Sequence, residues 1–223
     1  ANITGTPTYT STGTSTGYIS VTWDEAAHSQ TTGVGQPAPL VPGDFTVTFT
    51  QNGGNAAQAV VTSVTNNAGG ALTGGETSIR IYIENRTGGG IATATSGVET
   101  VQVFVAANQI YSVTNLATPA TENTGTLTMP DTLAPNAPAG LALATADDSG
   151  SSNSDRITSQ TTNLTISGTA EANSTVRLYQ PNSAGTLLAT VTADALGNWS
   201  TDISLAAGAT YTVVATARDA ALN

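Results

Sequence analysis

The sequence predicts an all-β protein made of two tandem antiparallel β-sandwiches, and three observations support this prediction. The 223 residues are enough for two domains of roughly 100 residues each. Short runs of alternating apolar and polar residues recur along the chain, separated by Gly, Asn, Asp and Pro. Three prolines between Pro130 and Pro138 indicate a short, stiff linker, which divides the chain into residues 1–130 and 131–223.

The runs in residues 1–130 have the pattern of half-buried strands. Residues 78–84 place three isoleucines on one face, and residues 101–105 alternate in the same way. The strands expected in this half are Tyr18–Trp23, Phe45–Thr50, Val60–Thr65, Ser78–Glu84 and Thr100–Ala106.

Two local patterns add to this prediction. Asn52-Gly53 lies between the second and third of these strands, and Asn-Gly favours a hairpin because both residues tolerate positive φ. Asp24–Gln30 is the one helix candidate, and a loop is the alternative there.

In residues 131–223 the turn signals fall at intervals of about 8–12 residues, the spacing typical of a β-sandwich. The strands expected in this half are Gly140–Ala144, Asn163–Gly168, Thr175–Gln180, Leu187–Thr192, Asn198–Ile203 and Tyr211–Ala217.

The composition excludes several classes of function. With no Cys there is neither a disulfide nor a thiol, so we expect a bound metal to stiffen the fold. The chain holds 15 acidic residues, five Arg and no Lys, for a net charge of -10. Such a chain is not expected to bind nucleic acid or an anionic membrane surface, and no apolar run is long enough to span a bilayer. Because Ala1 begins in mid-pattern, we interpret the chain as a piece of a longer protein.

A series of motifs in the second half occurs in a definite order. It begins with Asp131-Thr132-Leu133-Ala134-Pro135 and the acidic, Ser-rich loop 147–158, and continues with Gly168–Glu171, Gly197-Asn198-Trp199 and residues 218–223. This order resembles the bacterial Ig-like repeats of large secreted adhesins of the RTX and biofilm type. The resemblance implies two Ig-like sandwiches, with residues 1–130 a looser relative.

The resemblance also implies calcium at domain junctions, an extended rod and a role in adhesion. There are two departures from the family pattern. Leu222 stands where such repeats have Gly, and the chain stops before the final strand that they carry.

The positions of the acidic residues support a calcium site independently of the resemblance. If the strands of the second half alternate in direction, Asp131 and the loops at residues 171, 194 and 219 lie at the linker end, and loop 147–155 lies at the far end. Ca²⁺ takes six to eight oxygen ligands from carboxylates and carbonyls. The alternative is that these acids are solvated turn residues. The predicted metal ligands are Asp131, Asp147, Asp148, Asp155, Glu171 and Asp219, with Asp24, Glu25 and Asp44 as further candidates.

Other arrangements give little indication of catalysis. His28 is the single histidine, no nucleophile-elbow motif accompanies it, and adjacent carboxylates in one turn cannot flank a sugar. Trp23 and Trp199 either pack in a core or stack on a sugar. We therefore expect no enzyme, no catalytic residue and no organic cofactor.

The function expected from the sequence is a calcium-rigidified extracellular module of a bacterial surface adhesin, secreted or held at the cell surface. It would serve as a spacer and in cell-surface or biofilm attachment. Its expected partners are neighbouring repeats of the same chain and a surface glycan or protein target. The alternatives are a carbohydrate-binding module and a surface-layer subunit.

Overall fold

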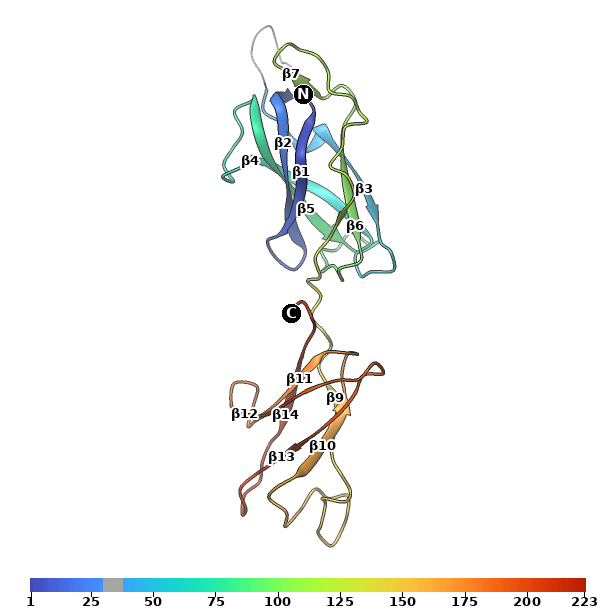
Figure 1. Cartoon of the computed structure of the whole chain (residues 1–223), viewed down its shortest axis with the longest axis vertical. Coiled ribbons are helices and arrows are strands. Elements are labelled where there is room, and N and C mark those ends of the chain that lie inside the picture. The colour runs from blue at the N-terminus through green and yellow to red at the C-terminus, as the bar shows by residue number, and fades with distance from the viewer. Residues whose placement is uncertain (30–37) are drawn as a thin grey trace. The chain divides into compact units, whose positions relative to one another are not determined.

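A computed structural model describes residues 1–29 and 38–223. The chain forms two compact units, Ala1–Leu133 (unit 1) and Ala134–Asn223 (unit 2). Both are built from antiparallel strands, as predicted (Figure 1). Among the described residues, the structure contains no helix long and apolar enough to cross a membrane.

Unit 1 is a sandwich of two sheets. One sheet has the order β1-β2-β5-β4, with β7 also paired to β2, and the other has the order β3-β6-β8. Its strands are β1 (Ile3–Ser11), β2 (Thr16–Ser29), β3 (Phe45–Thr50), β4 (Gln58–Asn66), β5 (Glu76–Arg86), β6 (Thr100–Val105), β7 (Ile110–Ser112) and β8 (Leu127–Thr128), with a short 3-10 helix, η1 (Pro42–Asp44), before β3.

The core of unit 1 comes from the alternation seen in the sequence. On β5 the three isoleucines 79, 81 and 83 are at most 1% exposed, and Val101, Val103 and Val105 on β6 face them from the other sheet. Each such side chain contributes about 1.5–3 kcal/mol when fully buried. Trp23 is buried in the same core, so it is not a sugar-stacking residue.

Two predictions for unit 1 were wrong. Residues 24–29 continue strand β2 instead of forming a helix or a loop, because they pair with β5 and β7; Gln30 lies outside the described residues. The predicted hairpin between β3 and β4 is also absent. β3 pairs with β6, and β4 pairs with β5 in the other sheet.

The Asn52-Gly53 turn therefore connects two sheets. Both residues have positive φ, 50° and 80°, as expected. The following loop is held by Glu99, whose Oε1 accepts a hydrogen bond of 2.9 Å from the backbone N–H of Ala56. Gly54 is needed beside it, since a β-carbon there would lie 2.3 Å from the Glu99 carboxyl carbon. This anchor directs the chain away from β3.

Unit 2 consists of two three-stranded sheets, with the orders β13-β10-β9 and β12-β11-β14. Leu164, Val176, Leu178, Trp199 and Ile203 form its core, so Trp199 also packs inside the fold. Its strands are β9 (Ala139–Leu143), β10 (Leu164–Thr169), β11 (Thr175–Gln180), β12 (Thr186–Thr192), β13 (Asn198–Ile203) and β14 (Val214–Arg218).

Candidate functional site

The strand registers of unit 2 place its acidic loops at two opposite ends, as the alternation of strands predicted. Thr175 at the start of β11 pairs with Thr192 and with Arg218, so the loops that hold Glu171, Asp194 and Asp219 lie at one end. The loop of residues 147–158 follows β9 and precedes β10 at the other end.

Asp148 is the buried carboxylate of loop 147–158. Its side chain is 4% exposed, and its Oδ2 accepts a hydrogen bond of 3.0 Å from the backbone N–H of Arg156. Its Oδ1 is buried and has no hydrogen-bond partner. A buried acceptor without a partner costs about 1–3 kcal/mol, and more when it is charged. This oxygen is therefore open to water or a cation.

Several other oxygens gather within the same loop around Gly150. A β-carbon on Gly150 would lie 2.9 Å from the carbonyl oxygen of Ile157, 3.7 Å from that of Ser152 and 3.8 Å from Oδ1 of Asp155. Backbone carbonyls and carboxylates are the ligands that Ca²⁺ prefers. Loop 147–158 therefore brings two carbonyl oxygens and one carboxylate oxygen close to Gly150.

Most of the other predicted ligands accept hydrogen bonds from the chain itself, and so does Asp155, whose Oδ1 accepts from the N–H of Ile157 at 3.0 Å. Asp147 Oδ2 accepts from the N–H of Thr165 at 2.8 Å, and Asp131 Oδ1 accepts from the N–H of Leu133 at 3.0 Å. Asp219 accepts from the backbone N–H and the amide of Asn223, at 3.0 and 3.1 Å. Glu171 lies exposed between β10 and β11. Within residues 1–29 and 38–223, no group of three or more His, Cys, Asp or Glu side chains is close enough to hold a metal.

The three further candidates in unit 1 are also engaged. Asp24 accepts two hydrogen bonds from Asn2, both of 2.7 Å, and these lower its pKa. Glu25 lies 3.0 Å from the terminal amine of Ala1. Asp44 is buried, which raises its pKa, although it accepts hydrogen bonds from the N–H of Val41 and the hydroxyl of Ser29.

Sequence reasoning missed the backbone oxygens of loop 147–158. The sequence predicted carbonyl ligands in general but named only carboxylates, whereas the structure places the carbonyls of Ser152 and Ile157 near Gly150, together with Oδ1 of Asp155. Gly150 was the available signal, because a glycine within an acidic loop allows the backbone to approach closely. The sequence also could not distinguish the buried Asp148 from its neighbour Asp147.

His28 does not face a hydroxyl group. Its Nδ1 lies 2.9 Å from the carbonyl oxygen of Ser29, and its Nε2 lies 2.8 Å from the carbonyl oxygen of Ser112. The ring is 3% exposed. These contacts tie the end of β2 to β7, which gives His28 a structural position.

A cleft of about 910 Å³ lies beside the acidic loop in unit 2. Its walls combine apolar side chains from the β9 sheet with the segment that leads into β14, including Leu141, Leu143, Ile203 and Val213. β14 pairs with β11 along one side and is an edge strand of its sheet.

Residues 132–223 match the family described as bacterial Ig-like domain. A search of curated proteins finds no match to the chain. The matched range contains all six strands of unit 2, the acidic loop and Asp219. Unit 2 is therefore similar to the bacterial Ig-like domain family over its whole length.

Proposed function

We propose that this chain is a calcium-rigidified module of a bacterial cell-surface or secreted adhesin, in which the two sandwiches act as spacers. The similarity of unit 2 to bacterial Ig-like domains supports an extracellular repeat module. The acidic composition supports a calcium-rich, extracellular setting, because bound cations relieve the repulsion between 15 carboxylates.

One observation carries the calcium part of the proposal: the buried Oδ1 of Asp148 has no partner within its loop. Asp148 and Asp155 would bind Ca²⁺ together with the carbonyl oxygens of Ser152 and Ile157. The ion would neutralise the two carboxylates and tie together the two halves of the loop. The role of the ion would be structural, because it would stiffen the loop and order this end of the domain.

The test is calcium binding and thermal unfolding of the whole chain after treatment with EGTA. At a hundredfold excess over the Kd, one bound ion stabilises the native state by about 2.7 kcal/mol, which raises the Tm of a 90-residue unit by about 10–20 °C. Mg²⁺ should have a much smaller effect, because it demands near-octahedral geometry and keeps its water. In a chain carrying Trp23→Phe, the fluorescence of Trp199 follows unit 2 alone.

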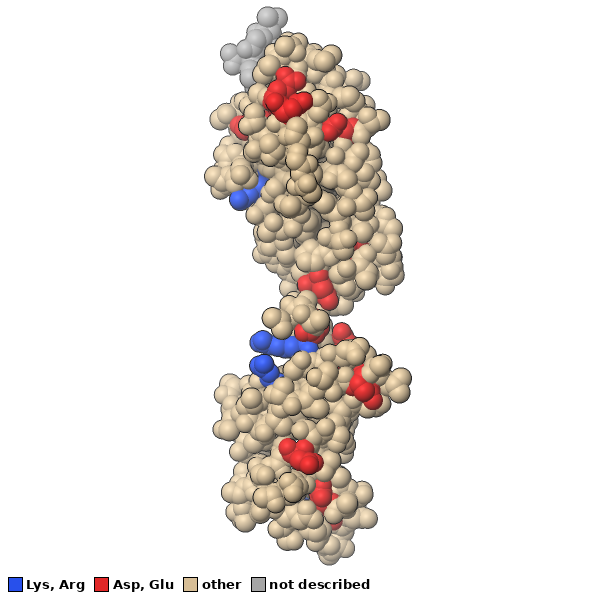
Figure 2. Space-filling model, in the orientation of Figure 1, with Lys and Arg blue, Asp and Glu red and all other residues tan. Residues whose placement is uncertain are grey.

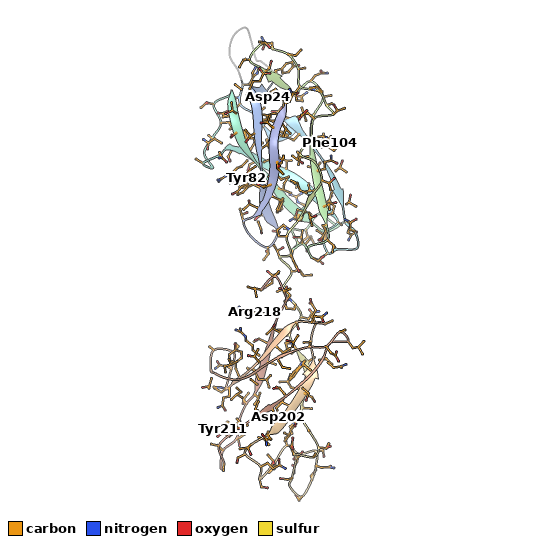
Figure 3. All side chains as sticks on the ribbon, in the orientation of Figure 1. Asp24, Tyr82, Phe104, Asp202, Tyr211 and Arg218 are labelled. Atoms are coloured by element: carbon orange, nitrogen blue, oxygen red, sulfur yellow. The ribbon has the colours of Figure 1, made fainter. Side chains whose placement is uncertain are left out.

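Two variants locate the ion. The double change D148N/D155N should abolish the calcium-dependent rise in Tm. Asp202→Asn removes the same kind of charge from an exposed position on β13, where Oδ1 accepts from the hydroxyl of Thr165 (Figure 3), and should leave the rise intact. An unchanged Tm in the native chain with millimolar Ca²⁺ would refute the calcium proposal.

The spacer role is tested separately by small-angle scattering in Ca²⁺ and in EGTA. The spacer proposal expects a narrow distribution of extended shapes. Ca²⁺ should change this distribution little, because loop 147–158 lies at the opposite end of unit 2 from the loops of Glu171 and Asp219. Attachment to a surface is tested by adding the chain to bacterial biofilms and measuring whether it competes with adhesion.

A further inference from the structure

Two of the five arginines lie together on the outer face of one sheet in unit 2. Val176 and Leu178 of β11 point into the core, so Arg177 between them points outward. Arg177 pairs with Thr216 of β14, and Thr175 pairs with Arg218. The two arginines are therefore diagonal neighbours on one face, roughly 7–8 Å apart, with their β-carbons somewhat closer.

Neither guanidinium is neutralised within the described residues. The ion pairs found there join Glu25 to the terminal amine and Glu84 to Arg86. No hydrogen bond or ring contact involves the side chain of Arg177 or of Arg218, and the Nε of Arg177 is buried without a partner. The nearby carboxylates of Asp194 and Asp219 accept hydrogen bonds from their own turns.

The arginines of unit 1 differ from this pair. Arg86 binds Glu84 through its Nε at 2.8 Å, and Arg80 lies over the ring of Tyr18, 4.5 Å from its centroid. Those contacts stabilise the sheet of unit 1. By contrast, neither Arg177 nor Arg218 makes an ion pair or a ring contact among the described residues, so neither stabilises its sheet in this way.

The surroundings of the pair are rich in hydroxyl groups. The registers place Thr175, Thr190 and Thr192 on the same face, and Tyr179 follows two residues after Arg177. Figure 2 shows basic side chains gathered on unit 2 in a molecule whose other visible charges are mostly acidic, and Arg218 lies at the end of β14 (Figure 3). We call Arg177, Arg218, Tyr179, Thr175, Thr190, Thr192 and Thr216 the arginine face.

We propose that the arginine face binds a polysaccharide that contains uronic acid. A guanidinium presents a planar fork that matches the two oxygens of a carboxylate, and two such forks suit successive acidic sugars. The threonine hydroxyls match the sugar hydroxyls, and the Tyr179 ring offers a surface for a sugar ring to stack on.

The charge of the chain favours a uronate over denser anions. A net charge of -10 repels polyanions at long range. A uronic acid carries a single charge on each sugar ring, so this repulsion is smaller than for a heavily sulfated glycan or a nucleic acid. Binding of such a polysaccharide would define the class of target for the adhesive role proposed above. The biological setting of this inference rests on that proposed function.

The test uses the whole chain and a tetrasaccharide of galacturonic acid, in EGTA so that calcium plays no part. Titration followed by amide NMR should shift signals of residues 175–179, 190–192 and 214–218. The methyl-esterified tetrasaccharide has the same rings without charge and should bind at least ~10-fold more weakly, because one lost charged contact corresponds to about tenfold in affinity. Equal binding of the ester would overturn the proposal.

Two double variants distinguish the effect of the planar guanidinium from the effect of its positive charge. R177Q/R218Q should abolish binding, and R177K/R218K should weaken it, because Lys keeps the charge but lacks the planar fork. Arg86→Gln removes one positive charge from unit 1 and should leave binding unchanged. The Tm of each variant checks that it is folded.

The other outcomes of the titration also test the assignment of a uronic acid as the ligand. Equal or tighter binding of a heparin-derived tetrasaccharide or of a poly-glutamate peptide would overturn the uronate assignment. Absence of binding to every probe would overturn it as well. Because the titration contains no Ca²⁺, its failure would leave the calcium-dependent spacer function standing, and loss of the calcium effect would leave the arginine face standing.

Discussion

The two units bury carboxylates in different ways. In unit 1 the side chain of Glu99 is fully buried, and its oxygens accept hydrogen bonds from the N–H groups of Ala56 and Ser96, both at 2.9 Å. In unit 2 the side chain of Asp148 is almost as buried, but one of its oxygens has no partner. A carboxylate satisfied by its own chain holds a fold together, whereas a buried carboxylate oxygen without a partner in the chain is open to water or an ion.

The largest effect that follows from this contrast is the loss of the Glu99 carboxylate. Glu99→Gln places an amide group where two backbone N–H donors need acceptors, so unit 1 should lose about 3 kcal/mol of unfolding free energy. Urea unfolding followed by Trp23 fluorescence, in a chain carrying Trp199→Phe, measures this. Glu84→Gln, which breaks the exposed pair with Arg86, should cost less than about 1 kcal/mol.

Asp148→Asn should behave in the opposite way in EGTA. Its unpartnered oxygen gains nothing from being charged, so the stability of unit 2 should stay the same or rise. A loss as large as that of Glu99→Gln would mean that Asp148 is a structural carboxylate like Glu99, and the distinction between the two units would fail.

A smaller effect is expected at Gly150. A β-carbon there would lie 2.9 Å from the carbonyl oxygen of Ile157, so Gly150→Ala should cost unit 2 about 1–3 kcal/mol and weaken calcium binding. Gly88→Ala is the matched control, because nothing lies within 4 Å of its β-carbon position. Thermal unfolding with and without Ca²⁺ measures both, and equal effects would show that the oxygens around Gly150 do not form a tight site.

The smallest expected effect is on the pH dependence of unit 1. Burial raises the pKa of Glu99, but hydrogen bonds from the N–H groups of Ala56 and Ser96 outweigh it, and the net pKa lies below the ordinary value of 4.5. The folded state therefore holds this proton less tightly than the unfolded state. The resulting stability is present above pH 4.5 and is lost as the pH falls through the folded pKa. Glu99→Gln should make the urea midpoint less sensitive to pH in this range; identical slopes would contradict this.

The strands with period-two alternation could be predicted from the sequence, because alternation reports directly on which face is buried. β3, β11 and β13 have the predicted bounds. β1 was missed, because Ile3–Ser11 is mostly exposed and interrupted by Gly5 and Pro7, so its pairing with β2 leaves little pattern. The Asn52-Gly53 turn has the expected φ values, but local turn chemistry cannot tell which sheet the next strand will join.

The candidate sites, like the strands, could be predicted from the sequence only in part. The acidic loop 147–158 was visible in the sequence, but the burial of Asp148 and the carbonyls around Gly150 depend on the folded path of the loop. The arginine face could not be predicted at all, since Arg177 and Arg218 are 41 positions apart (218 minus 177) and meet only through the register of β11 and β14. Leu222 has a φ of 71°, so the turn that Gly would favour forms with Leu in its place.

The strict alternation on β5 also restricts how unit 1 can misfold. Sliding that strand by one residue would expose Ile79, Ile81 and Ile83 to water and would push Arg80, Tyr82 and Glu84 into the interior. No near-native arrangement of comparable energy is therefore available one step away. A sandwich with such a sequence has a single low-energy pairing of this strand to find.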